Sequence, residues 1–76
     1  MKRQYMIDYR KDRGIDIATM AAACKCSECL LRIVEADEQN VTHPKIAERI
    51  RKKYRLTKKQ YLQMIPREYR DTKMQK

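Results

Sequence analysis

Glycine and proline are scarce in this chain of 76 residues, which contains only Gly14, Pro44 and Pro66. β-Sandwiches and β-barrels need many turn residues, so the shortage excludes these folds and favours an all-α domain. Long apolar runs are also missing, because no stretch approaches the roughly 18 residues that cross a membrane. The first residues, MKRQYMIDYRK, contain no apolar segment typical of a signal peptide. We therefore expect neither membrane insertion nor secretion.

Cysteine occurs only as Cys24, Cys26 and Cys29, an odd number that cannot pair completely within one chain. Such a crowded set suits a reducing compartment better than a secreted disulfide scaffold, so we expect a cytoplasmic protein. The three thiols and His43 have the ligand types of a zinc site. Cys24 and Cys26, however, fall at expected core positions, where cysteine serves as a small hydrophobic residue. We therefore expect no metal and no other cofactor, and an outward Cys29 with redox sensing as its alternative role.

Basic residues outnumber acidic ones by 19 to 10, which gives a formal net charge of +9. The charge is uneven, because residues 15–41 hold two basic and five acidic side chains, whereas residues 42–76 hold twelve basic and three acidic ones. A charge this large on a small domain favours polyanionic partners, with nucleic acid first. The alternative is that the charge only keeps the protein soluble.

Apolar spacing and capping residues predict five helices. The expected helices cover residues 4–13, 17–24, 28–35, 44–54 and 58–65. The start and stop signals that delimit them are Gly14, Asp16, Ser27, Pro44 and the T-x-x-Q capping box at Thr57. We expect these helices to form one domain of residues 1–66, followed by a basic C-terminal tail of residues 67–76.

The helices expected over residues 17–24 and 28–35 form a candidate helix-turn-helix unit. Two short helices that cross steeply need a small residue at their contact, and Ala21 supplies it. The residues expected in their shared core are Met20, Cys24, Cys26, Leu31 and Val34. The other side of the second helix is then free to enter a DNA major groove, whose width admits one α-helix. A helical hairpin in a small bundle, without groove binding, is the alternative.

Residues 14–37, GIDIATMAAACKCSECLLRIVEAD, resemble without a gap the helix-turn-helix of the phage repressor and Cro family. The positions that carry the resemblance are Gly14, Met20, Ala21, Ser27, Leu31, Val34 and Glu35. The resemblance extends over residues 4–65 and implies a compact five-helix, lambda-repressor-like DNA-binding domain. It also implies a partly buried structural ion pair between Arg10 and Glu35.

The resemblance also maps the residues that would contact DNA. The base-reading positions are Ser27, Glu28, Cys29, Arg32 and Ile33. Arg32 is of the type that reads guanine through two hydrogen bonds, and Glu28 is of the type that accepts one from cytosine N4. The remaining predicted DNA-binding residues are Ile17 at the motif start, Lys25 in its turn, and Lys45 and Arg49 as phosphate contacts.

We therefore predict a sequence-specific regulator of transcription that binds double-stranded DNA as a homodimer and associates with the nucleoid. No nucleophile, base and pocket are suggested by the spacing of His, Cys and Tyr residues, so we expect no enzyme. The alternative is a protein-interaction module on the same fold, such as an antirepressor or an accessory protein of a mobile element. Its interface would be an exposed apolar patch of Ile17, Cys29, Leu30 and Ile33. RNA binding through the basic tail is a third possibility.

Overall fold

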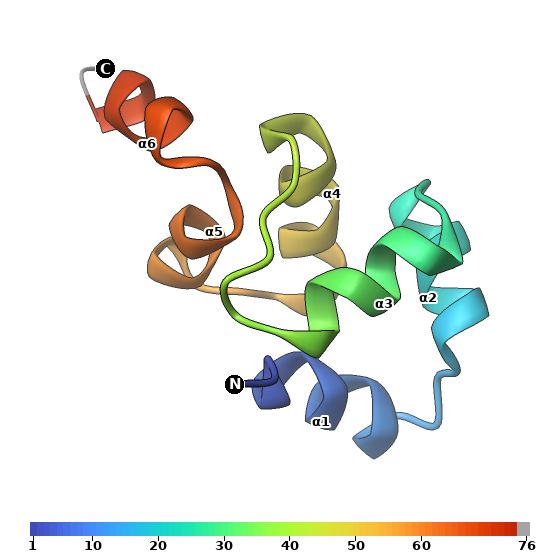
Figure 1. Cartoon of the computed structure of the whole chain (residues 1–76). Helices are drawn as coiled ribbons and strands as arrows, with labels where there is room; N and C mark the ends of the chain where they lie inside the picture. Colours follow the sequence, from blue (N-terminus) through green and yellow to red (C-terminus); the bar gives the residue numbers. More distant parts are fainter. Residues whose placement is uncertain (75–76) are drawn as a thin grey trace.

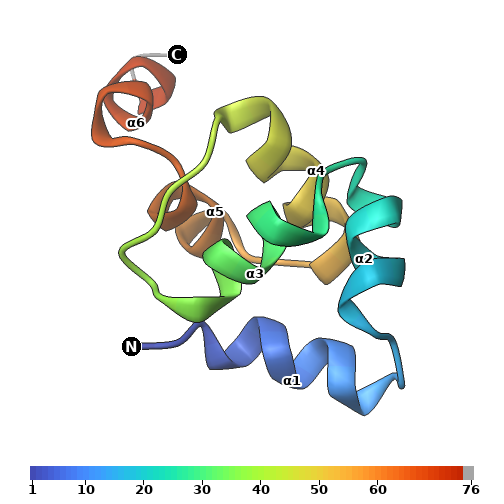
Figure 2. The same ribbon diagram turned by 45° about the vertical axis from the view of Figure 1, so that its right-hand side comes forward.

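The computed structural model describes residues 1–74, with side chains described for residues 1–70. Over these residues the chain is all-helical, without strands, and none of its helices is long and apolar enough to span a bilayer. The helices in chain order are α1 (Gln4–Asp12), α2 (Ile17–Cys24), α3 (Glu28–Ala36), α4 (Pro44–Tyr54), α5 (Lys58–Met64) and α6 (Arg67–Met74). Figure 1 shows α3 and α4 between α2 and α5, and Figure 2 shows α1 and α6 at opposite ends of the molecule.

Side-chain caps set the starts of α2, α3 and α5, as the sequence predicts. The Asp16 carboxylate and the Ser27 hydroxyl each accept a hydrogen bond from the backbone N–H three residues later, at 2.7 Å and 3.0 Å. Thr57 and Gln60 form a complete capping box at α5. Each cap of this kind contributes about 1 kcal/mol to the free energy of unfolding. Gly14 has a φ of 64°, the left-handed conformation expected after α1.

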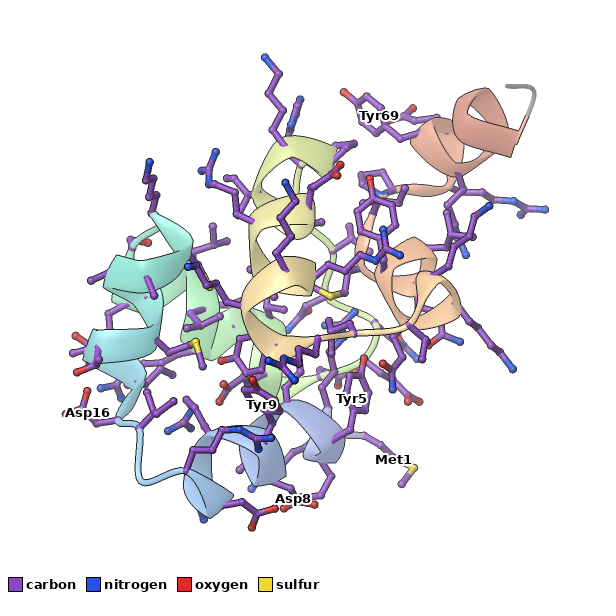
Figure 3. The ribbon with its side chains drawn as sticks, turned by 180° about the vertical axis from the view of Figure 1, so that it is seen from behind. Met1, Tyr5, Asp8, Tyr9, Asp16 and Tyr69 are labelled. Carbon is purple, nitrogen blue, oxygen red and sulfur yellow. The ribbon has the colours of Figure 1, made fainter. Side chains whose placement is uncertain are left out.

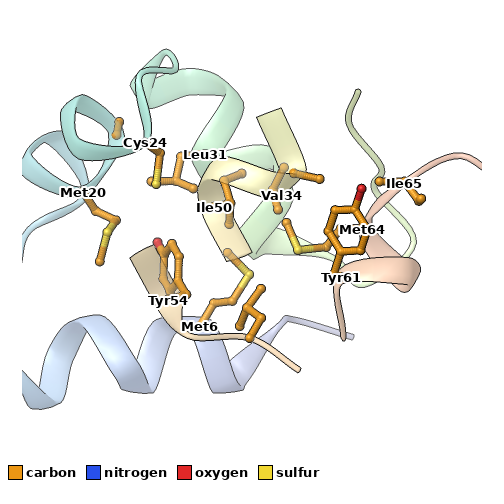
Figure 4. Packing of buried hydrophobic residues seen from close by; sticks show 13 residues of the cluster. Met6, Met20, Cys24, Leu31, Val34, Ile50, Tyr54, Tyr61, Met64 and Ile65 are labelled. Carbon is orange, nitrogen blue, oxygen red and sulfur yellow. The ribbon is translucent and has the colours of Figure 1, made fainter. Parts of the chain in front are cut away.

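The core is one cluster to which α1, α2, α3, α4 and α5 all contribute (Figure 4). Its buried apolar members are Met6, Met20, Ala21, Cys24, Leu31, Val34, Ala47, Ile50, Tyr54, Leu56, Tyr61, Met64 and Ile65. Burying one large apolar side chain stabilises a fold by about 1.5–3 kcal/mol, so this cluster supplies the main driving force. Figure 3 shows Tyr5 and Tyr9 directed from α1 toward the interior, whereas Asp8 is directed to solvent.

Arg3 fastens the N-terminal segment, a role that the sequence does not reveal. Its side chain is 1 % exposed. The guanidinium donates four hydrogen bonds of 2.6–3.2 Å to backbone carbonyls, those of Val34, Asp37, Glu38 and Gln63. A cation at a helix C-terminus is favourable because the carbonyls there lack helical partners. Arg3 therefore joins the end of α3 and the loop after it to the end of α5.

The segment that we expected to be a basic C-terminal tail contains a sixth helix, Arg67–Met74, beyond the five predicted helices. Residues 75–76 of that predicted tail lie outside the described part of the chain. Pro66 ends α5 as expected, but its carbonyl also accepts hydrogen bonds from the N–H groups of Tyr69 and Arg70 and so begins α6. The Tyr69 ring contacts the ring of His43, with centroids 5.5 Å apart, which places α6 beside the start of α4.

Candidate nucleic-acid interface

The turn between α2 and α3 contains a compact helix-ending motif. Lys25 is in the left-handed region, with φ 55° and ψ 45°. The Cys26 N–H donates to the Ala21 carbonyl at 3.0 Å, and the Lys25 N–H donates to the Ala22 carbonyl at 3.1 Å. This pair of bonds is the Schellman pattern, which satisfies carbonyls at a helix C-terminus. The chain therefore turns directly from α2 into α3, with lysine at a position where glycine would be less strained.

Arg49 supports this turn from α4. Its Nε donates to the Cys24 carbonyl at 2.9 Å, and its Nη2 donates to the Lys25 carbonyl at 3.1 Å. The side chain is partly buried, and both hydrogen bonds satisfy carbonyls at the end of α2. These hydrogen bonds give Arg49 a structural role, and its contact to phosphate stays a prediction.

The two sides of α3 face different environments. Leu31 and Val34 are fully buried and Glu35 is 4 % exposed, because this side packs against α1 and α2. The exposed side chains opposite them, which we call the outer face of α3, are Glu28, Cys29, Arg32 and Ile33. Ser27, the fifth predicted base-reading residue, is also exposed, but its hydroxyl is the cap of α3. The structure therefore brings the predicted base-reading residues together on one open side.

An ion pair anchors the inner side of α3. Arg10 and Glu35 form the bidentate pair that the family resemblance implies, with both N–O distances 2.9 Å. The Tyr54 hydroxyl donates to Glu35 Oε2 at 2.6 Å, so one carboxylate joins α1, α3 and α4. Burial, reinforced by the hydrogen bond to Glu35, raises the pKa of Tyr54. The hydrogen bond from Arg10 to Glu35 raises the pKa of Arg10.

A second ion pair lies on the outer face of α3. Arg32 Nη2 is 2.6 Å from Glu28 Oε1, and the two residues are one helical turn apart. Their side chains are 63 % and 44 % exposed, respectively. An exposed pair at this spacing stabilises a helix by about 0.3–0.5 kcal/mol, so the fold gains little from it. Both charged groups remain accessible to a ligand.

The other predicted DNA contacts divide into exposed and packed side chains. Lys25 and Lys45 are exposed, in the turn of the motif and in the first turn of α4. Ile17 is partly buried and packs against the core. Lys25 and Lys45 are therefore exposed cations, while Ile17 belongs mainly to the packing of α2.

The cysteines take the positions that the helix pattern predicts. Cys24 is fully buried, Cys26 is partly buried against the core, and Cys29 is exposed. Burial raises the pKa of the Cys24 thiol to about 11 and also raises the pKa of Cys26. In the described part of the chain, no three His, Cys, Asp or Glu side chains are grouped as a metal ion requires.

The apolar patch predicted for the alternative function is divided. Ile17 and Leu30 pack against the core, because α2 and α3 turn these side chains inward. Only Cys29 and Ile33 of the four are exposed, with Ile33 48 % exposed. The continuous patch that we expected is thus reduced to two adjacent side chains on the outer face of α3.

Two residues with important contacts, Arg3 and Tyr54, escaped prediction in these roles. Tyr54 was recognisable as a buried residue from its place on the apolar stripe of α4, but nothing in the sequence indicated its bond to Glu35. Arg3 offered no local signal, because its partners are backbone carbonyls distant along the chain.

No protein-family model matches the chain, and the curated proteins and the solved structures contain no significant match to it.

Proposed function

We propose that this protein is a transcriptional regulator that binds double-stranded DNA and places the outer face of α3 in the major groove. The observation that carries the proposal is the division of α3 into a buried side and an open side. Leu31 and Val34 hold the helix in the core, while its other side stays accessible. A major groove admits one α-helix, and the net charge of +9 favours a polyanion.

The outer face supplies suitable chemistry for reading bases. Arg32 can donate two hydrogen bonds to guanine O6 and N7, and Glu28 can accept one from cytosine N4. Cys29 and Ile33 offer apolar contact to a thymine methyl group. The exposed Lys25 and Lys45 contribute contacts to phosphates that give affinity without sequence choice.

The resemblance of residues 14–37 to the phage repressor and Cro family supports a lambda-repressor-like arrangement with α2 and α3 as the helix-turn-helix. The bidentate Arg10–Glu35 pair agrees with that reading. Helix-turn-helix proteins of this kind bind as dimers to half-sites one helical turn apart. We therefore propose a homodimer that acts in the cytoplasm on the nucleoid.

A fluorescence-anisotropy titration with duplex DNA at two salt concentrations tests this function. For each phosphate that the protein neutralises, the slope of log affinity against log salt becomes steeper by about 0.9. We expect Lys45→Ala to weaken every duplex alike and to flatten this slope. Lys59→Ala, which removes the same charge from an exposed position on α5, is the matched control and should change affinity less. Failure of the wild-type protein to bind any duplex at low salt would contradict the proposal.

Exposed apolar side chains favour a protein partner as the second candidate function. Ile33 and Val41 are 48 % and 46 % exposed. The Asn40 side chain donates to the Ile33 carbonyl at 2.7 Å, which ties the loop that carries Val41 to the end of α3. Under this alternative, Ile33→Asp abolishes capture of one specific protein, and the wild-type protein binds no duplex.

A further inference from the structure

The two members of the ion pair on the outer face of α3, Arg32 and Glu28, have different roles in binding. Arg32 and Glu28 are 2.6 Å apart and both are exposed. We propose that Glu28 is a positioning residue, which orients the Arg32 guanidinium so that it can read a guanine in duplex DNA. This inference rests on the proposed function and adds to it that Glu28 determines specificity by positioning Arg32.

The helix itself explains why these two side chains meet. Side chains on an α-helix lean toward its N-terminus, so Arg32 reaches back over the turn that carries Glu28. The order of glutamate before arginine at this spacing is the favourable one, and Glu28 lies in the first turn of α3, where the helix dipole favours a carboxylate. The pair is therefore formed before any ligand binds.

The pair leaves Arg32 able to bind a base. A guanidinium has five N–H donors in a planar fork, and the observed contact to Glu28 involves Nη2. Guanine requires two donors for O6 and N7, so enough donors remain for a bidentate contact. An arginine that is already oriented loses fewer rotamers when it binds, and preorganisation of this kind improves a specific contact.

The charge of Glu28 makes the pair selective. A carboxylate beside the groove repels phosphates, so it weakens binding to DNA that offers only its backbone. Arg32 is the only arginine between Arg13 and Arg49, and Arg49 is engaged by carbonyls of α2 and the turn. Glu28 thus lowers affinity for all sequences through its charge and increases the difference between sequences through Arg32.

The test first compares wild type, Glu28→Gln and Arg32→Ala on chemically matched duplexes. Wild-type protein first selects its preferred duplexes from a randomised library. Affinity is then measured for the best duplex and for the same duplex with the preferred guanine replaced by 7-deazaguanine, which lacks the N7 acceptor. We expect wild type to discriminate between them by about tenfold. Glu28→Gln should lose most of this discrimination while binding random duplex more tightly, and Arg32→Ala should lose all of it.

The double variant decides whether Glu28 acts through Arg32. In the Arg32→Ala background, Glu28→Gln should have no further effect on discrimination. Glu28→Asp keeps the charge but shortens the side chain, so it should lose discrimination without the gain in affinity for random duplex. Asp12→Asn makes the same charge change at an exposed position on α1 and should leave discrimination intact. Circular dichroism checks that each variant remains helical.

The outcomes separate this inference from the function on which it rests. Selective binding that Glu28→Gln leaves unchanged overturns the role of Glu28 and keeps the DNA-binding function. A loss of discrimination that is equally large in the presence and absence of Arg32 also overturns it, because Glu28 would then act alone. A wild-type protein that binds no duplex overturns both proposals.

Discussion

The helix α3 takes part in two arginine–glutamate pairs in opposite environments, one with Arg10 of α1 and one within α3 itself. On the inner side, the side chains of Arg10 and Glu35 are 14 % and 5 % exposed, and Tyr54 adds a third member. On the outer side, Arg32 and Glu28 are 63 % and 44 % exposed. The Glu35 carboxylate accepts its hydrogen bonds from Arg10 of α1 and Tyr54 of α4. Within the described residues, the Arg32 and Glu28 side chains of the outer pair bond only to each other, and both are open to solvent.

This difference teaches where each pair acts. Removing one member of a buried pair leaves an uncompensated charge without water, so the inner pair is essential to the fold. An exposed pair contributes little to stability, because water solvates both groups when they separate. The same residue types therefore hold the fold on one side of α3 and remain available for a ligand on the other.

The largest expected effect is the loss of the inner pair. Glu35→Ala leaves the Arg10 guanidinium and the Tyr54 hydroxyl without their shared acceptor. We expect the free energy of unfolding to fall by about 3–5 kcal/mol. Glu28→Ala, on the outer side, should lower it by less than about 1 kcal/mol. Urea denaturation of both variants measures the difference, and similar losses would contradict the comparison.

Truncating an apolar side chain should likewise cost more stability on the inner side of α3 than on the outer face. Leu31→Ala removes a fully buried side chain and leaves a cavity, so we expect a loss of about 3 kcal/mol. Ile33→Ala shortens a side chain that is 48 % exposed and should change stability by only about 0.5 kcal/mol. Thermal unfolding of the two variants tests this. A large loss for Ile33→Ala would show that the outer face is packed.

The buried and exposed cysteines should also differ in how they make stability depend on pH. Burial raises the pKa of Cys24 from its ordinary value of 9.0 to about 11. Between these values the unfolded chain releases the thiol proton and the folded chain keeps it, so stability falls as the pH rises from 9 to 11. A rise of two pKa units corresponds to a loss of about 3 kcal/mol in the free energy of unfolding. Below pH 9 this contribution is fully present.

Two cysteine variants isolate this effect. Cys24→Ala leaves a cavity and so lowers the free energy of unfolding at neutral pH. Because the variant lacks the buried thiol, its free energy of unfolding should fall less than that of wild type as the pH rises above 9. Cys29→Ala removes an exposed thiol and should retain the wild-type decline. Denaturant midpoints measured at several pH values check both variants. An identical decline in Cys24→Ala and wild type would exclude the buried thiol as its source.

Local signals made much of the fold predictable. Asp16, Ser27 and Thr57 accept the hydrogen bonds that their positions before apolar runs indicate, because a cap depends on residues only three positions apart. The apolar spacing of α3 likewise separated Leu31 and Val34 from the outer face. The sequence alone therefore predicts which side of α3 is open, without information on the helices that pack against α3.

Contacts that depend on tertiary assembly escaped prediction. Arg3 meets carbonyls at the ends of α3 and α5, which come together only when the chain is folded. The sequence predicts a phosphate contact for Arg49 but does not reveal that Arg49 also donates to carbonyls at the end of α2. The sequence predicts Pro66 only as the stop after α5, whereas the Pro66 carbonyl also accepts the hydrogen bonds that begin α6.

Alkylation of Cys29 tests most directly the claim that the outer face of α3 contacts DNA. Cys29 is the exposed thiol on that face, while Cys24 is buried and serves as an internal reference in the same chain. The rate is measured by mass spectrometry with and without saturating duplex at low salt. We predict that bound duplex slows Cys29 alkylation at least several-fold and leaves Cys24 unreactive. An unchanged Cys29 rate on a fully bound duplex would contradict the account.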